Sequence, residues 1–111
     1  MPRYVPKKGD LITLSFDPQT GHEQKGRRPA LVVSNDLFNR HTGLAIVCPI
    51  ANTDRGFPFH LAVPAASSLT GFVMVEQVKS VDYTTRRAKL IHRAPTEFVE
   101  NVIDLIDACI R

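Results

Sequence analysis

The sequence predicts a single, mainly β domain that ends in one α-helix, folded as a small, strongly bent sheet or SH3-like barrel. Two observations support this fold class. Several short apolar runs are separated by Gly, Pro, Asn and Asp, and the hydrophobic period changes from strand-like to helical near residue 95. The 111 residues suffice for one hydrophobic core, and no repeat or linker divides them. We therefore expect residues 1–111 to form one domain.

The first half of the chain predicts three strands and a helical turn. Residues 12–16 alternate apolar and polar side chains, and residues 30–33 form a continuous apolar run typical of a central strand. Residues 35–39 begin with an asparagine suited to capping a single helical turn. Residues 44–50 predict a third strand, in which Pro49 favours a sheet edge or a bulge.

The second half predicts three more strands and the helix. Residues 59–63 alternate again, residues 71–81 form a long strand-like run, and residues 88–91 form a short one. From Pro95 onward the spacing becomes helical, and a proline suits the first turn of a helix. The apolar stripe of this helix consists of Phe98, Val102, Leu105, Ile106 and Cys109, widened by Val99, Ile103 and Ile110.

The charge is unevenly distributed along the chain. The net charge is +3, but residues 1–94 hold 13 of the 14 basic residues and only 7 of the 11 acidic ones. A basic body with an acidic C-terminal segment favours a polyanionic or acidic partner. Solvation of a charged surface is the alternative.

Several classes of protein find no support in the sequence. No signal peptide is recognisable, and no apolar run approaches the roughly 18 residues of a membrane span, so we expect a cytoplasmic protein that does not enter membranes. Cys48 and Cys109 lie in apolar stretches and are expected to be reduced thiols in the core. No metal-ligand motif or phosphate-binding glycine loop occurs, so we expect neither a metal nor a cofactor.

The stretch GHEQKGRRP, residues 21–29, concentrates candidate chemistry. It places Glu23 near Arg27 and Arg28, between two glycines, and Pro29 fixes the re-entry into an apolar strand. Neighbouring cations keep the carboxylate ionised. The plain alternative is a surface ion pair worth about 0–1 kcal/mol.

A carboxylate beside a guanidinium suits phosphoryl transfer within RNA. Glu23 would take the proton of a ribose 2'-hydroxyl, a contribution of about 10²- to 10⁴-fold in rate. Arg28 would donate to two phosphate oxygens and stabilise the charge of the five-coordinate phosphorus. Because the RNA supplies its own nucleophile, this chemistry requires no metal.

Five segments together resemble the MazF/PemK/Kid family of toxin endoribonucleases, the mRNA interferases of type II toxin-antitoxin systems. They are GDL at 9–11, the G-x-E-Q-x-G-x-R-P signature at 21–29, LVVSND at 31–36, GFPF at 56–59, and GFVMVEQVKSVD at 71–82. The resemblance spans most of the chain.

The resemblance implies a homodimer of CcdB/PemK-like barrels, with RNA in a groove at the dimer interface. It implies sequence-specific, metal-independent cleavage of single-stranded mRNA that leaves a 2',3'-cyclic phosphate and a 5'-hydroxyl. It also implies a cognate antitoxin whose acidic, partly disordered tail occupies the basic groove.

The family's catalytic glutamate and arginine correspond to Glu23 and Arg28 of this chain. Where the family commonly has a threonine that holds the scissile phosphate, this chain has Ala51, so Asn52 or Thr53 is expected to donate instead. The residues expected to contact RNA are His22, Lys25, Arg27, Asn52, Thr53, Gln77 and Lys79.

Two other functions remain open on the sequence. One is a non-enzymatic, CcdB-like toxin that binds DNA gyrase. That toxin relies on a tryptophan near its C-terminus, whereas this chain has no tryptophan and ends Cys-Ile-Arg. The other is a weakly active or silent RNA-binding module, a reading that the alanine at position 51 permits.

Overall fold

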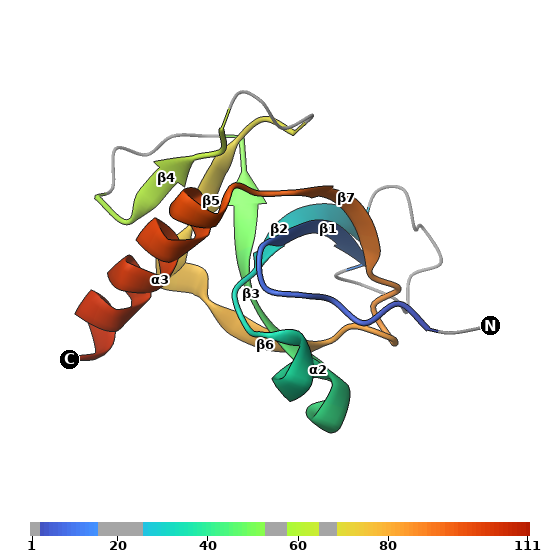
Figure 1. Ribbon diagram of the computed structural model, residues 1–111. Helices are drawn as coiled ribbons and strands as arrows, with labels where there is room; N and C mark the ends of the chain where they lie inside the picture. Colours follow the sequence, from blue (N-terminus) through green and yellow to red (C-terminus); the bar gives the residue numbers. More distant parts are fainter. Residues whose placement is uncertain (1–2, 16–25, 53–57, 65–68) are drawn as a thin grey trace.

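The computed structural model describes residues 3–15, 26–52, 58–64 and 69–111, which form an open, barrel-like β-sheet with one long helix packed beside it (Figure 1). The described elements, in chain order, are β1 (Asp10–Ser15), β2 (Arg27–Val32), α2 (Asp36–Thr42), β3 (Leu44–Ala51), β4 (His60–Ala62), β5 (Phe72–Met74), the short 3-10 helix η1 (Val75–Gln77), β6 (Lys79–Asp82), β7 (Lys89–Arg93) and α3 (Thr96–Ile110). The predicted fold class is confirmed.

The strands pair antiparallel in the order β4-β5-β3-β2-β1-β7, and β6 adds to β3. The predicted central position of β2 is confirmed, because β1 and β3 flank it. β3 pairs with β2 along one side and with both β6 and β5 along the other, so it joins the two halves of the sheet (Figure 1). The bend of the sheet follows from this sharing of one strand.

Pro49, predicted to mark a sheet edge or a bulge, lies inside β3 and pairs with Ala30 of β2, so the first alternative, a sheet edge, is wrong. The carbonyl of Ile46 accepts the N–H of Val33 at 2.9 Å, which places the backbone groups of even-numbered β3 residues on the β2 side. Backbone groups alternate between the two sides of a strand, so the missing N–H of Pro49 faces the opposite side. There the pairing with β6 ends at Val47 and the pairing with β5 begins at Ile50. The proline is tolerated because it occupies the gap between two partner strands.

The run 71–81, predicted as one strand, is two strands separated by η1. Between the pairs Ile50–Val73 and Val47–Lys79, β3 advances by three residues while the opposite chain advances by six. The excess residues coil into η1. The prediction of one continuous strand failed because an extra turn of backbone leaves the apolar pattern on either side intact.

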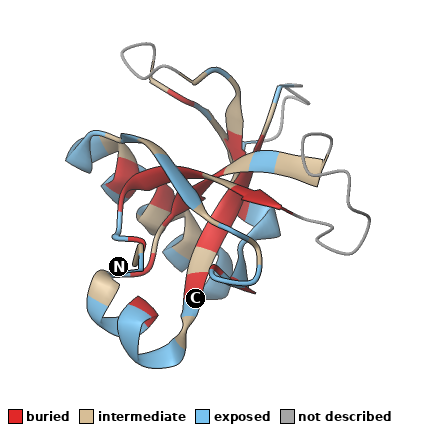
Figure 2. Cartoon of the chain, turned by 90° about the vertical axis from the view of Figure 1, so that its right-hand side faces the viewer, coloured by how far each residue is buried: buried red, intermediate tan, exposed pale blue. Residues whose placement is uncertain are grey.

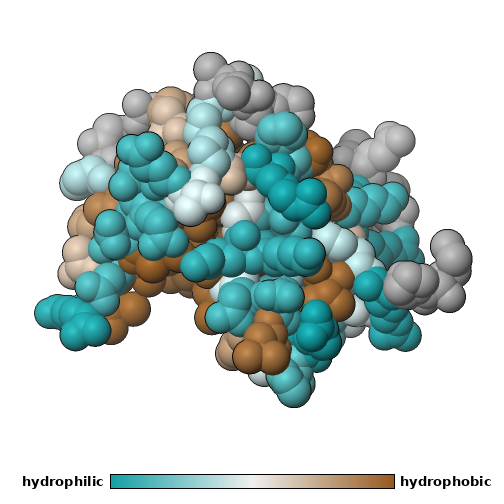
Figure 3. Space-filling view, viewed as in Figure 1, coloured by the Kyte–Doolittle hydropathy of each residue, from teal (hydrophilic) through white to brown (hydrophobic). Residues whose placement is uncertain are grey.

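The two faces of the sheet bury two hydrophobic clusters. Along β2, Leu31 belongs to the cluster beneath α3, while its neighbours Ala30 and Val32 belong to the cluster enclosed by the bent sheet. Val99 and Val102 of α3 are buried in the first cluster. Figure 2 shows the resulting buried strands at the centre of the molecule, and Figure 3 shows an outer face on which hydrophilic side chains predominate.

α2 is longer than the predicted single turn. The predicted cap is confirmed, because Asn35 Oδ1 accepts the N–H of Phe38 at 2.8 Å. The helix continues to Thr42 and ends at Gly43, whose φ of 73° is a left-handed conformation suited to glycine. Asn39, the last residue of the predicted turn, is fully buried in the middle of the helix.

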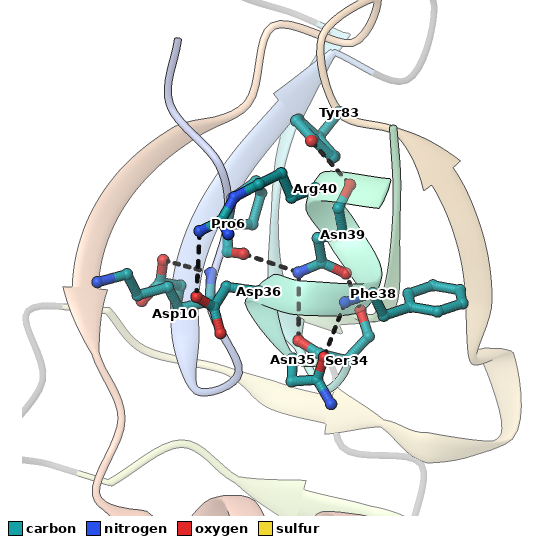
Figure 4. A network of polar contacts seen from close by, with 10 residues as sticks. Pro6, Asp10, Ser34, Asn35, Asp36, Phe38, Asn39, Arg40 and Tyr83 are labelled. Atoms are coloured by element: carbon teal, nitrogen blue, oxygen red, sulfur yellow. Dashed lines mark hydrogen bonds and ion pairs between the residues drawn. The ribbon is translucent and has the colours of Figure 1, made fainter. Parts of the chain in front are cut away.

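Asn39 ties α2 to three other segments of the chain (Figure 4). Its side-chain Nδ2 donates to the carbonyl of Pro6 at 2.7 Å, and its side-chain Oδ1 accepts from Ser34 Oγ. Its backbone carbonyl accepts the hydroxyl of Tyr83 at 2.9 Å. A buried amide with all these bonds satisfied fixes its surroundings. The N-terminal segment and the turn before β7 are thereby anchored to α2.

The two cysteines differ in environment. Cys48 is buried as predicted, and burial, together with the nearby charge of Glu76, raises the pKa of its thiol to about 12. Cys109 is exposed, so the expectation of a core thiol is wrong there. The apolar stripe of α3 extends beyond the edge of the core, and Ile110 is likewise 77% exposed. Of the helices that the structure describes, none has the length and apolar character needed to cross a membrane.

Candidate active site

A hollow of about 250 Å³ opens where β3 passes from one partner strand to the other. Its position follows from the features described above: Pro49 lies at the gap between two partner strands, and η1 occupies the excess chain opposite it. The hollow is lined by Arg28, Pro49, Ile50, Ala51, Met74, Gln77 and Lys79. The fold therefore brings together Arg28, Gln77 and Lys79, which are predicted site residues separated by about half the chain.

Arg28 reaches the hollow from the start of β2. Ala30 lies opposite Pro49 in the pairing of β2 with β3, and the same register continued by two residues sets Arg28 opposite Ala51. Side chains at facing positions of antiparallel strands lie on the same side of the sheet. The side chain of Arg28 is exposed, while the strand behind it is buried from Ala30 onward. An exposed guanidinium is thus held on a rigid base.

Gln77 and Lys79 reach the hollow from the opposite wall. Gln77 ends η1, and Lys79 begins β6, where it pairs with Val47. Both side chains belong to exposed residues. η1 in turn packs against α3, because Val75 is buried in the same cluster as Val102.

A hydrogen bond between His60 and Glu76 braces this wall. His60 Nε2 lies 2.9 Å from Glu76 Oε2, and the imidazole is only 1% exposed. Burial by itself raises the pKa of the Glu76 carboxyl, but the hydrogen bond from His60 and further bonds outweigh it, so the pKa lies below its usual value. Because Glu76 precedes Gln77 in η1, the brace connects β4 to the residues that line the hollow.

Arg27 takes a different position from its neighbour. Successive residues of a strand point to opposite faces, so Arg27 and Arg28 diverge. One guanidinium nitrogen of Arg27, Nη2, donates to the carbonyl of Thr13 at 3.0 Å, to its Oγ1 at 2.6 Å, and to the carbonyl of Arg87 at 2.8 Å. Arg27 therefore ties β2 to β1 and to the turn before β7, and it does not line the hollow.

The other predicted site residues fall into two groups. Asn52 follows Ala51 directly at the end of β3 and is exposed. Glu23, His22, Lys25 and Thr53 lie outside the described residues. Their roles stay predictions.

The hollow offers positive charge and an apolar floor. Arg28 and Lys79 supply cations, and none of the described residues that line the hollow is acidic. Met74 and Ile50 supply the apolar part, which the sequence did not single out because both residues read as ordinary strand positions. Such a site suits a phosphodiester with a base beside it. Within the described residues, no group of three His, Cys, Asp or Glu side chains is placed to hold a metal ion.

Comparison with known proteins decides the family. The family model of the PemK-like, MazF-like toxins of type II toxin-antitoxin systems matches residues 7–110. The chain belongs to the PemK-like, MazF-like toxin family. The resemblance inferred from the signature at 21–29 and from the EQVKS segment is thereby confirmed.

Curated relatives within the PemK-like, MazF-like family carry endoribonuclease names. The endoribonuclease toxin MazF of Escherichia coli is 40% identical over 86 residues, covering 78% of this chain and 77% of the relative. The endoribonuclease toxin ChpB of the same species is 37% identical over 112 residues, covering 94% of this chain and 93% of the relative.

Solved structures of the PemK-like, MazF-like family share the fold. MazF from Deinococcus radiodurans superposes with a TM-score of 0.86 at 39% identity, covering 97% of this chain and 98% of that one. A chain of the MazE-MazF structure from the same organism gives a TM-score of 0.88 at 36% identity, covering 96% of this chain and 97% of that one. The predicted CcdB/PemK-like barrel is confirmed.

Proposed function

We propose that this chain is an endoribonuclease toxin that cleaves single-stranded mRNA at a short specific sequence, without a metal ion, and is neutralised by a cognate antitoxin. The observation that carries the proposal is the hollow that collects Arg28, Gln77 and Lys79 around the end of β3. The endoribonuclease names of the curated relatives support the reaction class. The antitoxin is supported by the MazE-MazF structures that this fold matches.

The proposed reaction is a transfer within the RNA backbone. Glu23 removes the proton of a ribose 2'-hydroxyl, and the 2'-oxygen attacks the adjacent phosphorus. The bond from phosphorus to the 5'-oxygen breaks, that oxygen takes up a proton from the solvent, and Glu23 returns the proton it accepted to the solvent. The products carry a 2',3'-cyclic phosphate and a 5'-hydroxyl. No water or cofactor is consumed in this step.

Arg28 is proposed to stabilise the charge that gathers on the phosphate. A guanidinium donates from two nitrogens in a fixed plane, which matches two phosphate oxygens. Fixed donors of this kind are worth about 10²- to 10³-fold in rate each. Arg28 is suited to this role because it is exposed at the mouth of the hollow while its strand is anchored in the core.

The remaining predicted residues are proposed to hold the RNA. Gln77 and Lys79 supply an amide and an ammonium to the hollow, and Asn52 stands at its edge beside Ala51. We propose that Asn52 or Thr53 replaces the missing threonine hydroxyl at position 51. His22, Lys25 and Arg27 are proposed as further contacts from the loop and its base.

The proposal includes the assembly. We propose a cytoplasmic homodimer in which the RNA runs in a basic groove at the interface. The acidic, partly disordered tail of the antitoxin would occupy that groove and exclude RNA, since both are polyanions that would be drawn to Arg28 and Lys79.

The test is cleavage of a long single-stranded RNA by the purified protein in EDTA, with the cut ends mapped. We expect cutting at a recurrent short sequence, 2',3'-cyclic phosphate ends, and near-complete loss of cutting in Glu23→Ala and in Arg28→Ala. Retained cutting in both variants would refute the proposed roles. Binding without cutting would support a silent RNA-binding module, the alternative that Ala51 permits. Inhibition of DNA gyrase without cutting would support the CcdB-like function.

A further inference from the structure

A second hollow, of about 260 Å³, opens where the N-terminal segment meets the turn between β6 and β7. It is lined by Arg3, Tyr4, Tyr83, Thr84, Arg87 and Ala88. None of these residues lines the hollow around Arg28. The proposed cleavage reaction leaves this second hollow unused.

Both tyrosine rings in this hollow are fixed from behind. The hydroxyl of Tyr4 donates to Asp10 Oδ2, and the hydroxyl of Tyr83 donates to the carbonyl of Asn39 at 2.9 Å. Burial and the adjacent Asp10 raise the pKa of Tyr4 above its usual value, so its hydroxyl remains a donor. Tyr83 belongs to the buried core and is only 6% exposed, so it supports the hollow from below, whereas the half-buried Tyr4 presents its ring to the opening. A ring that is held in place offers a face on which a flat ligand can stack at little entropic cost.

Arg87, which also lines this hollow, has a backbone conformation that is rare for a residue with a side chain. Arg87 has a φ of 54°, the one positive value among the described non-glycine residues. Bonds on either side maintain it: Arg87 N donates to Thr84 O at 3.0 Å, and Ala88 N donates to Tyr83 O at 2.9 Å. A strained arginine retained in this way, where glycine would be relaxed, is typical of a functional position.

The charge of the hollow is positive. Arg3 and Arg87 belong to its lining, and among the described residues that line it none is acidic. The nearest carboxylate of the turn, that of Asp82, accepts the N–H groups of Thr84 and Thr85 at 3.0 and 2.9 Å. Asp10 lies behind Tyr4 and is paired with Arg93 at 3.4 Å. Two guanidinium groups beside the accessible ring of Tyr4 provide the means by which proteins hold an unpaired nucleotide, with the base on the ring and the phosphate on the cations.

We propose that this hollow binds one nucleotide of the RNA substrate, outside the scissile linkage. The choice of RNA as ligand rests on the proposed function, whereas the site itself rests on its own residues. Arg27 links the strand that carries Arg28 to the second hollow, because its Nη2 bonds the carbonyl of Arg87 while the next residue, Arg28, lines the first hollow. An RNA strand that is also held outside the scissile linkage would bind more tightly.

The composition of the chain provides a direct probe. It contains two tyrosines and no tryptophan, and both tyrosines line this hollow, so intrinsic tyrosine fluorescence reports on this site. We expect 5'-AMP and 5'-UMP to change the fluorescence saturably and to give matching heats in isothermal titration. Inorganic phosphate and adenosine each supply only half of a nucleotide. Each should therefore bind about tenfold more weakly than 5'-AMP, because it lacks either the stacked base or the phosphate contact.

Three variants locate the binding. Arg87→Gly removes the guanidinium but accepts the positive φ and retains the carbonyl used by Arg27, so it should fold and weaken mononucleotide binding by about tenfold. Arg3→Ala should act in the same direction. The matched control is Arg40→Ala, which removes an exposed cation of α2 paired only locally with Asp36 at 3.5 Å and should leave binding unchanged.

The outcomes separate this inference from the proposed function. Mononucleotide binding that persists in Arg28→Ala but weakens in Arg87→Gly supports the second site, even if no RNA is cut. On RNA that is cut, Arg87→Gly should raise KM for long substrates and leave kcat unchanged. Cleavage by a protein whose tyrosine fluorescence and titration heats do not respond to mononucleotides would overturn the inference. So would a response to inorganic phosphate equal to that for the nucleotides, or a response only to acidic peptides.

Discussion

At the scale of single residues, the site depends on which side chains of β2 and β3 face each other. Arg28 faces Ala51 in the continued register of β2 and β3, so a guanidinium and a methyl group share one wall of the hollow. The guanidinium supplies charge, and the methyl group leaves room without supplying a donor. Two substitutions at this pair test how the phosphate is held.

Arg28→Lys should retain the charge and lose the forked donors. We expect the cleavage rate to fall by about 10²-fold, because a lysine offers a point charge where two aligned N–H groups are needed. The melting temperature should stay unchanged, since the side chain is exposed. Single-turnover cleavage and thermal unfolding measured on the same preparation check both statements. A fully active lysine variant would show that charge alone suffices.

Ala51→Thr should supply the hydroxyl that this chain lacks beside Arg28. We expect faster cleavage, by about tenfold if the hydroxyl makes one good hydrogen bond to the phosphate in the transition state. The measurement is kcat/KM on a mapped cleavage site. If Asn52 or Thr53 already makes that bond, the rate will not rise, and Asn52→Ala or Thr53→Ala should then be the damaging change.

At the scale of elements, the hollow exists because β5, η1 and β6 follow β3 with three residues in excess. The start of β5 is packed against β3 at Gly71, whose φ is 136°. A Cβ on Gly71 would lie 2.8 Å from Ile50 Cγ2 and 2.9 Å from the carbonyl oxygen of Ala51. The position of the site wall therefore depends on the absence of one side chain.

Gly71→Ala should both destabilise the fold and slow cleavage. The positive φ costs about 1–2 kcal/mol for a residue with a Cβ, and the clash with β3 adds about 1–3 kcal/mol. Gly43→Ala is the matched control, because Gly43 also has a positive φ but a Cβ there meets nothing within 4 Å. Chemical denaturation should show a larger loss for Gly71→Ala, and cleavage per folded molecule should fall only in that variant. Equal effects of the two changes would show that the clash of the new Cβ with β3 does not displace that strand.

The His60–Glu76 brace makes the stability of η1 depend on pH. Because the pKa of Glu76 is lowered in the folded protein, its contribution to stability is present above the unfolded pKa and disappears as pH falls through the folded pKa. We expect the free energy of unfolding to decrease as the pH falls below the usual range of a glutamate pKa. Denaturation curves of Glu76→Gln should show a shallower decrease in this range. An identical pH dependence in both proteins would contradict the role of the brace.

At the scale of the whole molecule, the bent sheet brings basic residues from distant parts of the sequence to two hollows. Arg28 and Lys79 line one, Arg3 and Arg87 line the other, and Arg27 lies between them. The four acidic residues of α3, by contrast, line neither hollow. The net charge of +3 thus understates the field that a polyanion meets.

RNA binding should therefore depend steeply on salt. For an uncleavable single strand, log affinity should fall with log salt concentration at about 0.7 per phosphate contacted. Arg87→Gly and Lys79→Ala should each reduce that slope by about one contact, and Arg40→Ala should leave it unchanged. A slope near zero would rule out binding along the phosphate backbone.

The sequence by itself determined the fold class, the central strand at 30–33, the terminal helix and the family, because alternation, helical spacing and the signature at 21–29 are local patterns that depend on neighbouring residues. It also indicated Arg28, Gln77 and Lys79 as partners in one site. Only the tertiary structure decided that Pro49 lies in a central strand and that residues 71–81 divide at η1. The pairing of β3 depends on β5 and β6, which come from a distant part of the sequence, and the residues around Pro49 do not specify these partners. The second hollow was not predicted for the same reason: Arg3, Tyr4 and Tyr83 are ordinary residues in the sequence, and only folding brings them together.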